Sequence, residues 1–194
     1  MTQGIRWLFG SVGLIASGAA LAHTGSHGGA GLAAGLAHPF VGLDHLLAMV
    51  AVGVWAVQSG GRNRLVLPAT FVAAMAGGAL AGAYGIAVPH VESVIALSVL
   101  VTGMLVAFAA NTKSHWPVAL VALVALFHGH AHGAEMPAFS SPWLYFAGFL
   151  AATAMLHAIG VGAGTALKAR PAFLRTGGVA AGFAGAWLLV AILG

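Results

Sequence analysis

This chain of 194 residues is too apolar, and carries too few charges, to be a soluble protein. Hydrophobic residues make up 60% of it, only 5% of its residues are charged, and its mean hydropathy is +1.00. A soluble domain of this size needs many more charged side chains, so most of its surface must face lipid. Seven Lys and Arg against three acids give a formal net charge of +4, but these cations follow a topological pattern, so we expect no nucleic-acid partner. The lack of cysteine excludes disulfides, thiolate metal sites and cysteine nucleophiles.

Residues 1–22 have the pattern of a secretory signal peptide. One cation, Arg6, precedes an apolar stretch, and small residues end in Ala-Leu-Ala at 20–22, which is an A-x-A cleavage pattern. Cleavage there places His23 at the mature N-terminus, where its α-amine and the nearby His27 could bind a metal ion. Two alternatives stay open: an uncleaved first membrane helix, and a leader that is only a flexible, glycine-rich segment.

Six apolar stretches follow the signal peptide, each close to the roughly 20 residues that cross a bilayer as a helix. Lipid-exposed backbone must satisfy its own hydrogen bonds, and the alternation of a membrane β-barrel is absent from the sequence. We therefore predict an all-α, polytopic membrane protein in which residues 23–194 form one bundle. Its six spans are expected near 38–58, 65–87, 91–110, 117–134, 142–167 and 173–193.

The cations predict how this bundle is oriented. With His23 outside, the connections after the first, third and fifth spans face the cytoplasm. They hold all six cations of the mature chain, which are Arg62, Arg64, Lys113, Lys168, Arg170 and Arg175. This agrees with the positive-inside rule and places both mature termini on the outer side. Glycines four residues apart, such as Gly78 and Gly82, indicate close packing between helices.

The acids and most of the ten histidines gather toward the outer ends of the spans. Asp44 lies about 9 Å below the outer end of the first span. A carboxylate near a helix centre costs on the order of 3 kcal/mol on insertion, so we expect it to pair or to bind a cation. His38 and His45 are seven residues apart and are predicted to share a helix face, with Asp44 about 100° away. His90 and Glu92 begin the third span at the outer face.

The fourth span carries a stripe of candidate ligands. His128, His132 and Glu135 have helical spacing, whereas His130 points elsewhere but is kept among the candidate metal-binding residues. His157 lies in the middle of the fifth span. For one buried histidine alone, packing or a hydrogen bond between helices is the simpler interpretation. The convergence of several such groups from separate spans favours a shared metal site.

The type of ligand narrows the metal. Imidazole with one or two carboxylates suits divalent nickel, cobalt, zinc or copper, while calcium and magnesium prefer oxygen ligands. Met49 and Met155 lie near histidines, but a methionine in an apolar helix is more simply packing, which argues against copper(I). We expect no organic cofactor.

Two motifs carry a family resemblance. The sequence HPFVGLDH at 38–45 has the form His-x5-Asp-His, and FHGHAHGAE at 127–135 has the form Phe-His-Gly-x-Ala-His-Gly-x-Glu. Both resemble the HupE/UreJ family of membrane proteins, linked to nickel supply for hydrogenases and ureases. The resemblance implies a nickel permease of the bacterial cytoplasmic membrane, connected indirectly with maturation of those enzymes. It also implies metal-handling roles for His38, Asp44, His45, His128, His132 and Glu135, and leaves nickel or cobalt open.

We therefore expect a secondary transporter rather than an enzyme. The outer groups would capture a divalent ion and pass it to the intramembrane ligands, with His157 as an inner step. Transport would be facilitated diffusion, or coupled to protons or to the membrane potential, since no phosphate-binding motif is found. A membrane metal hydrolase is an alternative because His128 and His132 are four apart, although no glutamate follows His128 as in His-Glu-x-x-His. An accessory protein that holds nickel is another, and a homo-oligomer is left open.

Overall fold

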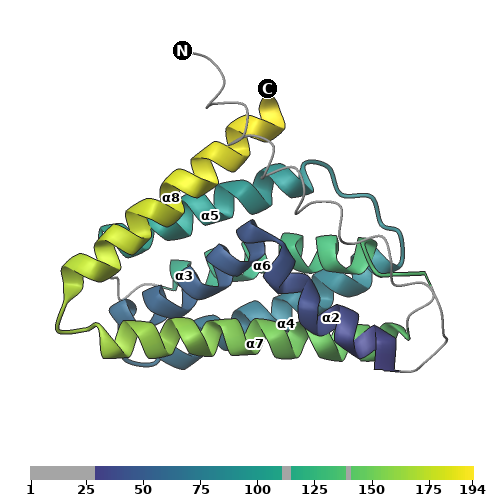
Figure 1. Ribbon diagram of the computed structural model, residues 1–194, viewed down its shortest axis with the longest axis horizontal. Helices are drawn as coiled ribbons and strands as arrows, with labels where there is room; N and C mark the ends of the chain where they lie inside the picture. Colours follow the sequence, from purple (N-terminus) through teal and green to yellow (C-terminus); the bar gives the residue numbers. More distant parts are fainter. Residues whose placement is uncertain (1–28, 111–114, 139–140) are drawn as a thin grey trace, which may run out of the picture.

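The described chain is helical throughout apart from its connections. A computed structural model describes residues 29–110, 115–138 and 141–194. Within these ranges there are seven helices and no strand, which confirms the all-α class. They are α2 (Gly29–Val41), α3 (Leu43–Ser59), α4 (Asn63–Ala83), α5 (Val91–Ala107), α6 (Trp116–Ala134), α7 (Pro142–Ala166) and α8 (Pro171–Leu193) (Figure 1). The predicted signal peptide, His23, His27 and Lys113 lie outside the described residues.

The helices are those of a multi-pass membrane protein, but the six uniform spans that we predicted are not found in the described residues. Four helices, α4, α6, α7 and α8, are long and apolar enough to cross a membrane, and the bent pair of α2 and α3 would be a fifth span. The apolar helix α5 has only 17 residues. At 1.5 Å per residue it extends about 26 Å, short of the roughly 30 Å of a hydrocarbon core.

The expected first span, residues 38–58, is broken by a sharp bend. Helix α2 begins at Gly29, before the expected start of this span at 38, and it meets α3 at an angle of 79°. Pro39 lies in the last turn of α2 and lacks an N–H to continue the helix. Gly42 then has an extended backbone, with φ −80° and ψ 112°. In the first turn of α3, the Asp44 carboxylate accepts the otherwise unpaired backbone N–H of His45.

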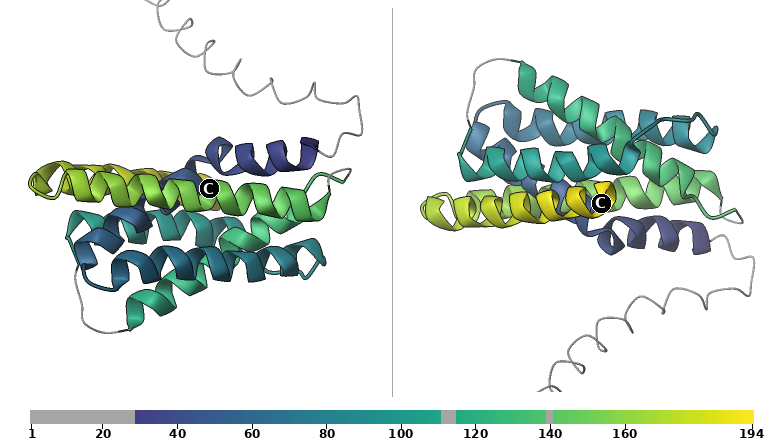
Figure 2. Two further views of the ribbon diagram at one scale, coloured as in Figure 1. Left: turned by 90° about the horizontal axis from the view of Figure 1, so that it is seen from below. Right: turned by 90° about the horizontal axis from the view of Figure 1, so that it is seen from above.

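Helix α3 lies at the centre of the bundle. It packs against α4, α5, α7 and α8, while α4 lies along α6 and α5 lies along α8. Figures 1 and 2 show α2 turning away from the axis of α3 and lying against one end of α7. The end of α2 and the start of α3 therefore lie in one region with the start of α5 and the end of α6.

Glycines bring α4 and α6 into backbone contact, as the spacing of Gly78 and Gly82 predicted. A Cβ at Gly78 would overlap with the carbonyl of Leu126, and a Cβ at Gly129 would overlap with the carbonyl of Met75. Small residues allow this approach, and van der Waals contact then supplies much of the association in lipid. The glycines of the 127–135 motif thus fix the position of the helix that carries its histidines.

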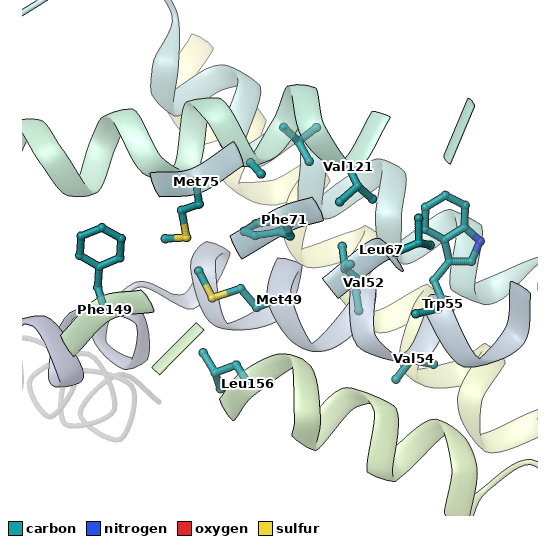
Figure 3. Close-up of a cluster of buried hydrophobic side chains, with 14 of the residues drawn as sticks. Met49, Val52, Val54, Trp55, Leu67, Phe71, Met75, Val121, Phe149 and Leu156 are labelled. Carbon is teal, nitrogen blue, oxygen red and sulfur yellow. The ribbon is translucent and has the colours of Figure 1, made fainter. Parts of the chain in front are cut away.

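The two ends of the bundle differ in charge. All five described cations lie at the α3–α4 and α7–α8 connections or in the first two turns of the helices that follow. The guanidinium of Arg64 donates to the hydroxyl of Thr165 at 3.0 Å, so the two connections meet at one end. Between the two ends lies a core of buried side chains that includes Met49, Trp55 and Phe71 (Figure 3).

Candidate metal centre

A cavity of about 380 Å³ opens where α2 ends, α3 and α5 begin and α6 ends. The polar residues lining it are His38, Asp44, His45, Glu92 and Glu135. The sequence contains only three acidic residues, and all three line this cavity. Such a concentration of negative charge in an apolar chain attracts cations.

Across this cavity, a hydrogen bond joins α2 to the connection that follows α6. His38 Nε2 donates to Glu135 Oε2 at 3.0 Å, and the two side chains are 29% and 51% exposed. Helix α6 ends at Ala134, so Glu135 is not on the helical stripe that the sequence predicted but in the connection beyond it. The hydrogen bond from His38 lowers the pKa of the Glu135 carboxyl below its usual range, which keeps the group ionised at neutral pH.

The Asp44 carboxylate fixes the ring of its neighbour His45. Asp44 Oδ1 lies 2.8 Å from His45 Nδ1, and an ionised carboxylate can only accept, so Nδ1 carries the proton. In a neutral imidazole, Nε2 then has a free lone pair. This Nε2 is buried and has no hydrogen-bond partner among the described residues. The arrangement is that of a carboxylate–histidine pair that prepares the second nitrogen for a metal ion.

Two deeper histidines are held in the same way by their own helices. His128 Nδ1 is 3.0 Å from the carbonyl of Val124, and His157 Nδ1 is 2.8 Å from the carbonyl of Thr153. A carbonyl accepts only, so each Nδ1 must donate and each neutral ring leaves Nε2 unprotonated. Both Nε2 atoms are buried without a partner in the described part of the chain.

The imidazoles of three helices are in contact with one another. The ring centroid of His45 lies 4.5 Å from that of His132 and 5.0 Å from that of His128, and the His38 ring lies 4.7 Å from His132. His38 and His45 do not share a helix face, because the chain bends at Gly42 between them. The bend nevertheless leaves their rings 6.4 Å apart, so the predicted meeting of the first and fourth spans is found by a different route.

His157 lies one aromatic ring further in. Phe71 on α4 contacts both His128 and His157, with centroid distances of 5.4 and 4.8 Å. Phe149 on α7 stacks on His132 at 5.0 Å with an interplanar angle of 4°. Aromatic residues in apolar helices give no signal in a sequence, so neither was predicted as part of the site. Both rings are fully buried, so they form part of the apolar packing around the imidazoles.

The remaining candidate ligands lie apart from this group. His130 Nε2 is 2.7 Å from the carbonyl of Ile86, which agrees with the prediction that it points elsewhere. His90 is exposed before α5 and does not line the cavity. Among residues 29–110, 115–138 and 141–194, no three His, Asp or Glu side chains already form an arrangement that could hold a metal ion.

These features define a class: a multi-pass membrane protein with carboxylates and imidazoles gathered at one end of its bundle. The model of the HupE / UreJ protein family matches residues 12–188. Protein HupE of Rhizobium leguminosarum bv. viciae is 49% identical over 171 residues, which cover 87% of this chain and 89% of that protein. No solved structure matches. The chain belongs to the HupE/UreJ family, whose members are accessory transporters of nickel and cobalt for hydrogenases and ureases.

Proposed function

We propose that this protein is a secondary permease or facilitator that moves divalent nickel, or cobalt, into the cytoplasm. One observation carries the proposal. Three buried imidazoles, His45, His128 and His157, are each held through Nδ1 and leave Nε2 without a partner in the described residues. His45 lines the cavity that holds all three acids. His128 and His157 lie deeper in the bundle. Membership of a nickel and cobalt transporter family supports the choice of cargo.

The route begins with capture at the cavity. Glu92, Glu135 and Asp44 supply negative charge, and imidazole nitrogens replace the waters of a borderline-soft ion such as nickel. His132 and His128 would take the ion next, and His157 would receive it beyond Phe71. Several moderate sites suit a pathway, because each must release the ion that it binds. His23, His27 and His90 are proposed as outer collectors.

Coordination of a metal ion by His38 Nε2 requires the hydrogen bond from this atom to Glu135 to break. His38 Nε2 cannot donate a hydrogen bond to Glu135 and coordinate a metal ion at the same time. An ion bound at this Nε2, and not at Nδ1, would therefore replace that hydrogen bond and draw the end of α2 and Glu135 onto itself. This exchange would assemble a ligand set that the described residues do not hold beforehand.

The direction of transport is proposed from charge. The five described cations lie at the end of the bundle away from the cavity, and cations are retained on the cytoplasmic side. The cavity would then open to the periplasm. A membrane potential negative inside favours inward movement of a divalent ion without nucleotide hydrolysis.

Reconstitution of the full chain into liposomes tests the proposal. Vesicles that contain a nickel-quenched dye should lose fluorescence when nickel is added outside, and His128→Gln should abolish the loss. His115→Gln is the matched control, because His115 is exposed at the other end of α6. Equal rates for His128→Gln and wild type would reject the site, and nickel binding without movement would support the accessory role instead.

A further inference from the structure

The hydroxyl of Tyr145 on α7 is an unexplained polar group beside the cavity. Its residue is 0% exposed, and the hydroxyl oxygen has no hydrogen-bond partner among the described residues. Most buried hydroxyls are paired, since an unpaired one loses its bonds to water without replacement. The buried hydroxyl of Tyr145 therefore calls for a partner that another state of the protein supplies.

The neighbours of Tyr145 place its ring beside the hydrogen bond between His38 and Glu135. The ring centroid of Tyr145 is 6.0 Å from that of His38, whose Nε2 donates to the Glu135 carboxylate. On its other side the ring packs against Phe149 at 5.6 Å, which in turn stacks on His132. Tyr145 therefore lies between His38 and Phe149, the ring that stacks on His132.

The chemistry of Glu135 supplies the missing partner. Its carboxylate accepts hydrogen bonds only, and in the resting structure it accepts one from His38. When His38 turns its Nε2 to a metal ion, Glu135 loses that donor. A carboxylate near a metal ion is normally held by a hydrogen bond to its other oxygen. The phenol is a buried donor that has no other hydrogen-bond partner in the described part of the chain.

We propose that Tyr145 is a positioning residue whose O–H donates to Glu135 in the ion-bound state, in place of His38. This inference rests on the proposed transport function. The hydroxyl has no partner among the described residues and would gain one when the ion binds, so its contribution would appear as metal affinity and not as stability of the metal-free protein.

The Tyr145→Phe variant of the full chain in detergent tests this role. The nickel dissociation constant, measured by calorimetric titration, should rise roughly 10- to 100-fold, as when the supporting partner of a metal ligand is lost. The thermal unfolding midpoint without nickel should stay equal or rise, because an unpaired buried hydroxyl has been removed. Tyr84→Phe is the control, since Tyr84 is 83% exposed and should change neither value.

Coupling to Glu135 separates positioning from packing. In a Glu135→Ala background, adding Tyr145→Phe should weaken nickel binding no further, because the acceptor is already gone. Additive losses, a lowered midpoint without nickel, or wild-type affinity in Tyr145→Phe would each overturn the inference. If the wild type neither binds nor moves nickel, the proposed function fails and this inference with it. If the wild type transports and Tyr145→Phe equals it, only the inference fails.

Discussion

The histidines at the cavity have charged hydrogen-bond partners, whereas the hydrogen-bonded histidines in the buried core have uncharged ones. At the cavity, the rings of His38 and His45 are bonded to the carboxylates of Glu135 and Asp44. In the core, His157 is held by a carbonyl of its own helix and packs against Phe71. All three acids of the chain line the cavity, so the negative charge available to a cation is concentrated at one end.

This contrast divides the work of moving an ion between two regions. Two unit charges about 4 Å apart interact by about 4 kcal/mol at the dielectric typical near a protein surface. A carboxylate offers a divalent ion about twice that attraction, whereas a neutral imidazole has no net charge to offer. The cavity should therefore set how tightly the ion is captured, whereas the core should set whether it passes. Single substitutions in each region test this division.

The largest effect is expected from His157→Gln, which should separate binding from transport. Uptake of radioactive nickel by cells should fall to the level of cells that lack the protein, because the inner ligand is gone. The affinity of the purified protein for nickel should stay within error of wild type, since the cavity ligands are intact. A parallel fall in affinity and uptake would instead show that His157 belongs to the capture site. His115→Gln, at an exposed position, should leave both measurements unchanged.

A smaller effect is expected from Asp44→Asn, at the other region. The amide oxygen can still accept from His45, but the negative charge that favours the ion and orders the ring is lost. Nickel affinity measured by titration should fall roughly 10- to 100-fold, in the range seen when the partner of a metal-binding histidine is removed. Uptake should recover at high external nickel, because the core pathway is untouched. Uptake that stays at background at every concentration would contradict the division between the two regions.

How far the sequence predicts this fold follows from the strength of its signals. Long apolar runs locate α4, α6, α7 and α8 to within a few residues, because a membrane span tolerates few charges. The break at Gly42 was missed, although Pro39 and Gly42 are both visible. Proline and glycine are common in membrane helices, so neither outweighed the hydrophobic run around them.

The candidate site was predictable where polar groups stand out and not where apolar ones matter. His45, His128 and His132 are conspicuous in an apolar chain, and their rings do meet. Phe71 and Tyr145 look like any lipid-facing aromatic until the fold places them against histidines. The separation of α2 and α6 along the chain also hides the pairing of His38 with Glu135, which depends on the bend.

The smallest effect is expected from Gly129→Ala, which tests whether close helix packing positions the core ligands. A Cβ at this residue would overlap with the carbonyl of Met75, so α4 and α6 must move apart. Overpacking of this kind destabilises a protein by about 1–3 kcal/mol, and the thermal midpoint in detergent should fall. Gly162→Ala is the matched control on α7, where an added Cβ meets nothing within 4 Å. There the gain in helix propensity should stabilise by up to about 1 kcal/mol.

The nickel affinity of Gly129→Ala distinguishes the effect of helix position from the effect of the Asp44 charge. Moving α6 shifts His128 and His132 away from His45, but it leaves the Asp44 carboxylate beside the His45 ring. Affinity should therefore fall less than in Asp44→Asn, while the transport rate falls more than the affinity does. If Gly129→Ala instead matched Gly162→Ala in midpoint and the wild type in transport, backbone contact between α4 and α6 would not be what holds the imidazoles in register.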